Sequence, residues 1–209
     1  IFQGNLRKIN YFEGWYFKHV SGDLREVWSF IPGVALTSHD PHSFIQVING
    51  ITGKTEYIKY PLEQFTWESN RLWVKTGDSI FTGNYIDLNI DNEKLKLTGH
   101  IEYNNIVKYP QSRFSPGIMG WYSFVPAMEC KHGIVSVNHD LKGNIEVNGK
   151  HIDLDNGKGY IEKDWGTSFP EAWIWIQSNN FSNHDTSFSF SIAKIPWLGR
   201  FFIGFISFL

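Results

Sequence analysis

The sequence predicts an all-β protein, built as an antiparallel barrel or sandwich. Turn-forming residues recur at short intervals along the 209 residues, and the runs between them are rich in Ile, Val, Phe, Tyr and Trp. No stretch has the apolar periodicity of a long amphipathic helix. A chain of this length can bury one large core.

Composition narrows the class of ligand. Aromatic residues make up 17% of the chain and charged residues 19%, which indicates more apolar lining than a core alone requires. The net charge of −2 argues against nucleic acid as a partner. Cys130 is the single cysteine, so no intrachain disulfide framework exists, and no apolar run reaches the length of a spanning helix. We therefore expect a soluble protein, with the cytoplasm favoured, and no cofactor.

Several elements can be placed in order. Residues 44–49 and 55–60 form a predicted hairpin around Gly53, and residues 145–147 and 151–154 form another around Asn148 and Gly149. Residues 62–68, 71–76, 80–90 and 95–103 alternate as barrel strands do. The loop 109–126, with three prolines, is a candidate lid. Residues 195–209 predict one or two buried strands with a turn at Gly199.

Residues 157–181 carry the main chemical signal. On a strand, side chains alternate between faces, so Tyr160, Glu162 and Asp164 share one face. Two carboxylates beside a phenol are a candidate acid–base group. The next predicted strand, after Pro170, places three further polar or aromatic side chains on one face, namely Trp173, Trp175 and Gln177.

Residues 11–18 contain a second unusual carboxylate. Glu13 shares a strand face with Tyr11, Trp15 and Phe17, and burial among aromatic rings disfavours its charged form. Glu13 either faces a ligand or is paired with an arginine or a backbone amide. Gln46 is a second candidate polar contact in a cavity, although a hydrogen bond to a neighbouring loop is the alternative.

The histidines allow weaker interpretations. His39 and His42 have a spacing that suits a metal, but the same residues are ordinary in a turn, and we expect no metal. His132 and His139 are candidate proton donors, with hydrogen-bonded histidines at strand ends as the alternative. We assign Cys130 to packing.

Five motifs resemble, in the same order along the chain, those of the tocopherol cyclase family. They are YFEGWYFK from Tyr11, SFIPG from Ser29, HSFIQ from His42, GIMGWYSFVPAMECKHGIVSVNHDLKG from Gly117 and GKGYIEKDWGTSFPEAWIWIQSNNF from Gly157. The resemblance, which extends to carotenoid hydratases, implies a lipocalin-like fold of two barrel-like halves. Residues 1–155 would form the first half, and residues 156–209 the opening strands of an incomplete second half.

The resemblance also implies a function. Such a protein binds an isoprenoid or prenylated hydroquinone, protonates its alkene and closes a chroman ring by phenol capture. Glu162 or Asp164 would donate the proton and Tyr160 would orient it. The expected binding residues are Glu13 or Gln46 for the head group, Gln177 as a further contact, and a cation-tolerant wall of Trp15, Trp165, Trp173 and Trp175.

Three alternatives stay open at this point. The protein is a non-catalytic carrier of a hydrophobic small molecule, or an isoprenoid hydratase, or the charged residues near Glu162 only seal the barrel through ion pairs. A peripheral membrane contact for uptake of the ligand is compatible with each of the first two.

Overall fold

The computed structural model describes residues 1–209, apart from 114–115, 126–127, 184–185, 198–199 and 209 and the side chains of 196–200. Twelve strands form one antiparallel sheet, ordered β4-β3-β2-β1-β12-β10-β9-β8-β7-β6-β5, with β11 paired to β10. The bounds are β1 Tyr11–Val20, β2 Val27–Leu36, β3 His42–Asn49, β4 Thr55–Tyr60, β5 Phe65–Trp67, β6 Trp73–Thr76, β7 Ser79–Thr82, β8 Tyr85–Asp91, β9 Lys96–Val107, β10 Cys130–Val147, β11 Lys150–Asp153 and β12 Lys158–Gly166.

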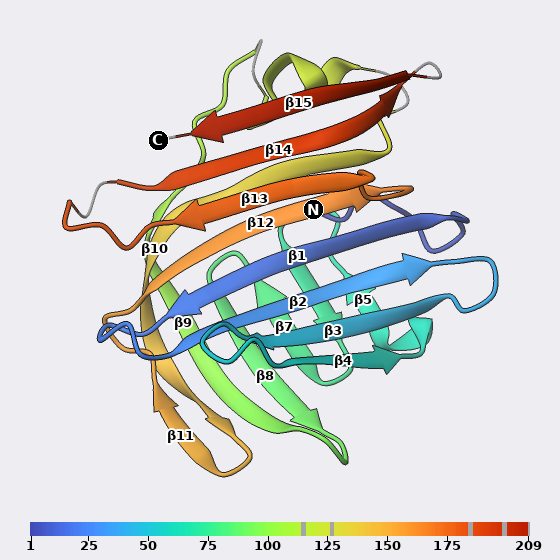
Figure 1. Cartoon of the computed structure of the whole chain (residues 1–209). Coiled ribbons are helices and arrows are strands. Elements are labelled where there is room, and N and C mark those ends of the chain that lie inside the picture. The colour runs from blue at the N-terminus through green and yellow to red at the C-terminus, as the bar shows by residue number, and fades with distance from the viewer. Residues whose placement is uncertain (114–115, 126–127, 184–185, 198–199, 209) are drawn as a thin grey trace.

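The large sheet curves into a nearly closed barrel, so the predicted all-β, lipocalin-like fold is confirmed. Strands β1–β4 lie in front of β5–β8 in Figure 1. Both predicted hairpins form, as β3–β4 and β10–β11. The only helices in the described part of the chain are two 3-10 turns, η1 (Leu62–Gln64) and η2 (Gly120–Phe124), and no helix there is long and apolar enough to cross a membrane.

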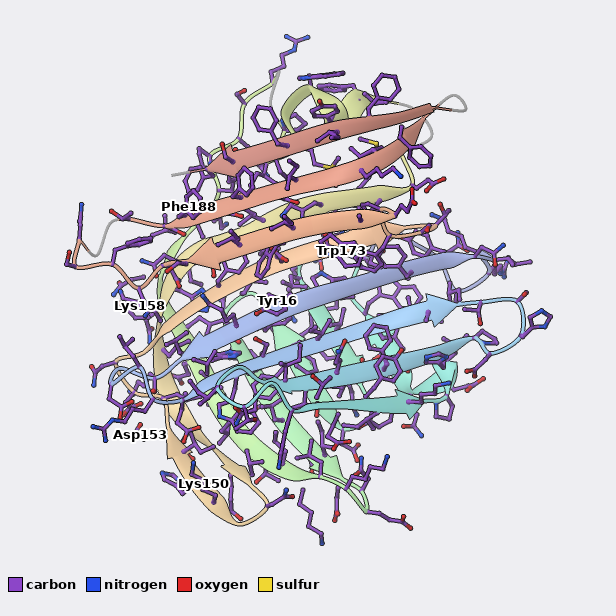
Figure 2. The ribbon with its side chains drawn as sticks, in the orientation of Figure 1. Tyr16, Lys150, Asp153, Lys158, Trp173 and Phe188 are labelled. Atoms are coloured by element: carbon purple, nitrogen blue, oxygen red, sulfur yellow. The ribbon has the colours of Figure 1, made fainter. Side chains whose placement is uncertain are left out.

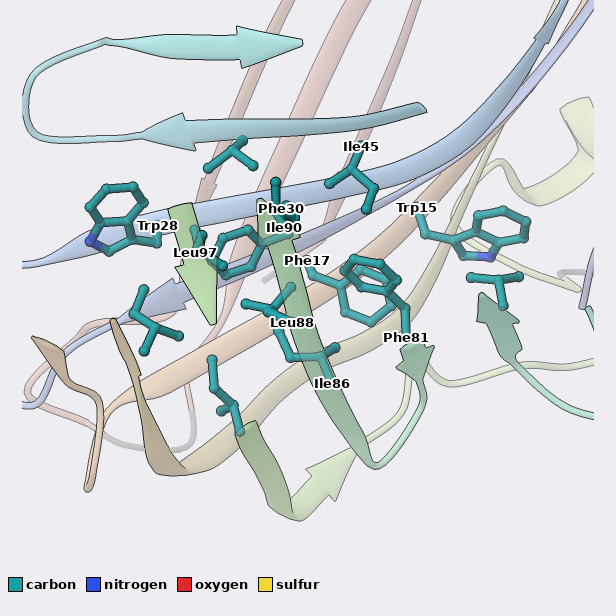
Figure 3. Packing of buried hydrophobic residues seen from close by; sticks show 14 of the residues in the cluster. Trp15, Phe17, Trp28, Phe30, Ile45, Phe81, Ile86, Leu88, Ile90 and Leu97 are labelled. Carbon is teal, nitrogen blue, oxygen red and sulfur yellow. The ribbon is translucent and has the colours of Figure 1, made fainter. Parts of the chain in front are cut away.

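The barrel interior holds the hydrophobic core. Apolar residues from front and back strands meet there, as Figure 3 shows for Trp15, Phe17, Phe30 and Phe81. These four side chains are fully buried. Since the core fills the barrel, a ligand site has to be sought elsewhere.

A second antiparallel sheet has the order β13-β14-β15, with bounds Ala172–Ser178, Phe188–Trp197 and Arg200–Phe208. It lies beside β12 and β10 at the top of Figure 1. The C-terminal strands were predicted, but their burial was not correct, because Ile203 is 73% and Phe205 66% exposed. The predicted turn at Gly199 lies outside the described residues.

The position of β12 bears on the expected division of the chain. We placed residues 156–209 in a second half, yet β12 pairs with β1 on one side and with β10 on the other, within the large sheet. The strands that leave the large sheet begin with β13. Division into two barrel-like halves remains a proposal.

Candidate functional site

A cleft of about 910 Å³ lies between the outer face of the large sheet and the three-stranded sheet. Figure 2 marks Tyr16 on β1 and Trp173 on β13, two strands that contribute to its lining. The predicted lid loop contributes Met119 and Tyr122 to the lining, while its residues 114, 115 and 126 lie outside the description. Most of the lining is apolar, and its main polar groups come from β10 and β12.

The register of β1 and β12 decides which residues face the cleft. Glu162 lies opposite Tyr16 and Asp164 lies opposite Gly14, and all four line the cleft. Because side chains alternate along a strand, Ile161 points the other way and packs in the barrel core. The alternation predicted from sequence for residues 160–165 is therefore the one that the structure has.

Glu162 is a buried carboxyl group that makes no salt bridge with a lysine or arginine among the described residues, although the ammonium of buried Lys18 on β1 interacts with it electrostatically. Its side chain is 7% exposed, and its Oε2 accepts a hydrogen bond of 2.6 Å from the hydroxyl of Tyr160. Burial raises the pKa of Glu162 to about 7, with nearby His132 opposing the rise and Asp164 adding to it. A carboxyl group with this pKa is partly protonated at neutral pH.

His132 on β10 lies between the two carboxylates. Its Nδ1 is 2.7 Å from Oδ1 of Asp164, and its Nε2 is 3.6 Å from Oε2 of Glu162. Burial alone would lower the pKa of His132, but Glu162 and Asp164 outweigh it and raise this pKa to about 9. The imidazole is therefore charged at neutral pH and neutralises Asp164, its hydrogen-bonded partner.

The same three residues offer ligand atoms within 4.8 Å of one another, the one such group in the described part of the chain. A metal needs ligand atoms that converge on a single point. Here the two ring nitrogens of His132 face different carboxylates, so the geometry favours shared protons over a coordinated ion. His39 and His42 form no such group; His42 bonds instead to the hydroxyl of Tyr57 at 2.9 Å.

Aromatic rings border Glu162. Trp175 packs edge-on against Tyr16, with ring centroids 5.4 Å apart, and its ring also lies 6.4 Å from that of Tyr160. The indole N–H of Trp175 favours the charged form of Glu162 but completes no hydrogen bond. Trp173 lines the cleft nearer its mouth, is 54% exposed, and stacks on Phe169.

Three of the expected binding residues lie on the opposite face of the sheet. Glu13 is fully buried and pairs with Lys163 at 3.0 Å, while it also accepts hydrogen bonds from Tyr11 and two backbone amides. Trp15 is buried in the core, and Trp165 packs against it beneath the ammonium of Lys163. Since these side chains do not line the cleft, the expected wall is corrected to Trp173 and Trp175, and Glu13 takes its alternative, paired role.

Gln46 and Gln177 have different surroundings. Gln46 lines the cleft, at some distance from the carboxylates. Gln177 follows Trp175 on the same face of β13, and both polar atoms of its amide are buried without a hydrogen-bond partner in the described part of the chain. It is outside the cleft lining, so its role in binding stays a proposal.

His139 and Cys130 are not part of the acid group. His139 is buried against Tyr103, with ring centroids 4.3 Å apart, and burial lowers its pKa to about 3. Cys130 lines the cleft, but burial raises the pKa of its thiol to about 12, so it is not a thiolate nucleophile.

Sequence reasoning missed how His132 works and missed Tyr16 and Gly14 altogether. His132 was a candidate on its own, whereas the structure joins it to Glu162 and Asp164 through strand pairing of residues about 30 positions apart. The expected binding residues Glu13 and Trp15 lie on the face of β1 that packs in the core, whereas Gly14 and Tyr16 on its other face line the cleft. Alternation divides a strand into two faces, but only the packing shows which one meets a cleft.

Comparison with known proteins identifies the family. The model of the family described as tocopherol cyclase-like matches residues 74–193, more than half of the chain. This chain belongs to the tocopherol cyclase-like family. The matched segment includes β10, β12 and β13, and therefore His132, Tyr160, Glu162, Asp164 and Trp175.

The relatives of this tocopherol cyclase-like chain include two plant proteins. It is 25% identical over 222 residues to the probable chloroplastic tocopherol cyclase of Oryza sativa subsp. japonica, covering 82% of this chain and 47% of the relative. It is 34% identical over 74 residues to the chloroplastic tocopherol cyclase of Zea mays, covering 35% of this chain and 16% of the relative. The chain thus spans less than half the length of these relatives.

Among solved structures, kievitone hydratase from Nectria haematococca superimposes with a TM-score of 0.54 at 10% identity. The superposition covers 91% of the tocopherol cyclase-like chain and 59% of the hydratase chain. At this level of identity the likeness concerns the fold alone.

Proposed function

We propose that this protein binds an isoprenoid or prenylated hydroquinone in the cleft and closes its chroman ring by acid catalysis, with Glu162 as the proton donor. The observation that carries the proposal is the environment of Glu162. Its carboxyl is buried at the floor of an apolar cleft, makes no salt bridge with a lysine or arginine in the described chain, and has a pKa near neutrality. An acid with that pKa suits proton transfer at neutral pH.

The reaction follows from this placement. The O–H bond of Glu162 breaks as a C–H bond forms at the less substituted alkene carbon, which leaves a tertiary cation beside Trp175 and Tyr16. Aromatic faces stabilise such a cation. The phenol oxygen then forms a C–O bond to the cation and loses its proton, which returns to Glu162. No oxidant or reductant is needed, because substrate and product are isomers.

The neighbours of Glu162 have separate roles in this proposal. Tyr160 orients the carboxyl through its 2.6 Å hydrogen bond. Asp164 holds the charged His132, whose positive charge limits how far the pKa of Glu162 rises. A cleft with few polar groups keeps water scarce, so that ring closure competes with hydration.

The decisive experiment measures binding and chroman formation with the same prenylated hydroquinone. Glu162→Gln is expected to reduce turnover by about 100-fold or more while the ligand still binds, the loss typical of a removed general acid. Glu129→Gln is the matched control, because Glu129 also lines the cleft but lies outside the cluster of Glu162, Asp164 and His132. Equal turnover by wild type and Glu162→Gln would refute the assignment of the acid.

Two rival functions are read from the same assay. An apolar cleft also suits a carrier, for which the ligand binds and no variant changes it chemically. A hydratase would instead trap the cation with water. Oxygen from isotopically labelled water would then appear in the product, whereas ring closure incorporates none.

A further inference from the structure

The floor of the cleft continues away from Glu162 across four more strands. Glu162 on β12 lies opposite Tyr16 on β1. Gln46 on β3 lies opposite Ile31 on β2 on one side and opposite Tyr57 on β4 on the other. Tyr16 and Ile31 are brought side by side by the flanking pairs Gly14–Gly33 and Phe17–Phe30. These five residues, one on each of β12, β1, β2, β3 and β4, all line the cleft and form one row.

Strand spacing gives the length of this row. Neighbouring strands lie about 4.8 Å apart, so Gln46 is about 14 Å and Tyr57 about 19 Å from Glu162 along the sheet. A ligand with its reacting alkene at Glu162 can therefore extend far beyond the acid. We call the part of the cleft over β1–β4 the distal arm.

The next row has no side chain at its centre. It runs from Asp164 to Gly14, Gly33 and Phe44 by strand pairing. A Cβ at Gly33 would lie 2.6 Å from the backbone oxygen of Glu13, so packing requires glycine there. A Cβ at Gly14 would meet nothing closer than 3.5 Å, and Gly14 has no positive φ. Neither local packing nor backbone conformation explains the glycine at position 14.

Because Gly14 has no side chain, only backbone lines the cleft floor at this position, between Asp164 and the distal arm. Beyond it lie apolar side chains, Ile31 and Ile48, and the stacked rings of Phe44 and Tyr57, with centroids 4.9 Å apart. Gln46 is the polar residue of this stretch, and its amide makes no hydrogen bond within the described residues. Its expected role as the head-group contact is therefore an alternative to an apolar chain in the same place.

We propose that the distal arm binds the apolar chain of the ligand, and that Gly14 determines how long a chain the cleft accepts. The occupant is an extended hydrocarbon chain continuing from the alkene at Glu162 over Gly14 to the Phe44–Tyr57 pair. This inference rests on the proposed function for the location of the alkene. It goes beyond that function in naming a selectivity residue and the direction in which the chain lies.

The test compares Gly14→Val with Gly14→Ala. Alanine adds a Cβ that the space at Gly14 accommodates, so it controls for the loss of glycine. Valine suits a strand and adds methyl groups over the bare floor. Both changes are made with Glu162→Gln, so that binding is measured without turnover. The probes are prenylated hydroquinones with one head group and increasing chain length, and the readout is the dissociation constant from tryptophan fluorescence.

In the Glu162→Gln protein with Gly14 unchanged, we expect affinity to increase with the length of the probe's chain until the distal arm is filled, because each buried methylene adds to the binding free energy. Gly14→Val should weaken binding of the probe with the longest chain by about tenfold or more and leave binding of the shortest probe unchanged. Its melting temperature should equal that of Gly14→Ala. A second variant, Phe44→Ala, should weaken long chains only, because it removes a wall at the end of the arm.

Equal affinity of Gly14→Val and Gly14→Ala for every chain would overturn the inference, as would an equal loss for short and long chains. Failure of the proposed function is a separate result, because it appears as unchanged substrate after incubation with wild type. Chain-length selectivity of binding is measured independently of that outcome.

Discussion

His132 and Asp164 are joined by a hydrogen bond of 2.7 Å between Nδ1 and Oδ1, although they lie 32 residues apart in the chain. The pair balances one negative charge with one positive charge at the cleft floor. Glu162, next to it, is then left as the carboxyl group that can hold a proton. In the proposed function, the charge of His132 therefore favours Glu162 over Asp164 as the acid.

Replacing His132 by Gln should raise the pKa of Glu162. The positive charge of His132 opposes the rise caused by burial, and the variant removes it. In the proposed function, turnover requires protonated Glu162, so the pH at which wild-type turnover falls, near 7, should move to higher pH in the variant. Carbon NMR of the labelled carboxyl measures this pKa directly, with Cys130→Ala on the same strand as control. An unchanged or lower pKa would contradict the prediction.

Glu162 should make the stability of the protein depend on pH. Its pKa rises from 4.5 in the unfolded chain to about 7 in the folded protein. Its contribution to the free energy of unfolding is therefore complete below pH 4.5 and is lost as the pH rises through 7. The shift corresponds to about 3 kcal/mol. Relative to wild type, Glu162→Gln should therefore become more stable as pH rises from 4.5 to 8 in urea titrations. A pH-independent difference would show that burial does not perturb this group.

The buried pair of Glu13 and Lys163 should stabilise the barrel without taking part in binding. Glu13→Gln leaves the ammonium of Lys163 buried without its counter-charge, which costs about 3–5 kcal/mol. Glu68→Gln, in an exposed pair with Arg71, is the control and should change stability little. Ligand affinity of the folded Glu13→Gln protein should equal that of wild type. A selective loss of affinity would restore Glu13 as a ligand contact.

Two buried histidines should destabilise the fold in acid. Burial lowers the pKa of His19 and of His139 to about 3. Below pH 6.5 both histidines are therefore protonated in the unfolded chain but stay neutral in the folded protein. Stability should fall from pH 6.5 downward, by about 2 kcal/mol for each histidine at pH 5. The difference in unfolding free energy between wild type and His139→Gln checks this. If the variant folds, its loss of stability between pH 6.5 and pH 5 should be about 2 kcal/mol smaller than that of wild type, because the opposite contribution of Glu162 is common to both proteins. His100→Gln, an exposed change, should not alter this loss.

The outer face of the three-stranded sheet should make this chain self-associate. Ile203 on β15 and Ile174 on β13 are exposed there, and neither residue lines the cleft. Exposed apolar surface of this kind is typical of a face that packs against another protein surface. Ile203→Lys with Ile174→Lys should shift sedimentation velocity profiles toward the monomer. Trp67→Lys, on another exposed patch, is the comparison, and an equal effect would argue against this sheet as the associating surface.

The sequence alone determined the all-β class, the hairpins at Gly53 and Gly149, and the shared face of Tyr160, Glu162 and Asp164. Each of these depends on neighbours in the chain, through turn residues and the two-residue period of a strand. The motifs, in turn, were enough to place the chain in its family, which the match over residues 74–193 supports.

The tertiary structure decided which strand faces meet the cleft and which partners surround Glu162. From the sequence, Glu13 and Trp15 were predicted to contact the ligand, but Tyr16 and Gly14 line the cleft instead. Alternation along a strand does not distinguish a face that packs in the core from a face that lines a cleft. The placement of His132 beside Asp164, and of Gly14 on the route to Gln46, depends on the pairing of distant strands. Registers between such strands are set by packing of the whole sheet, so no local pattern in the sequence encodes them.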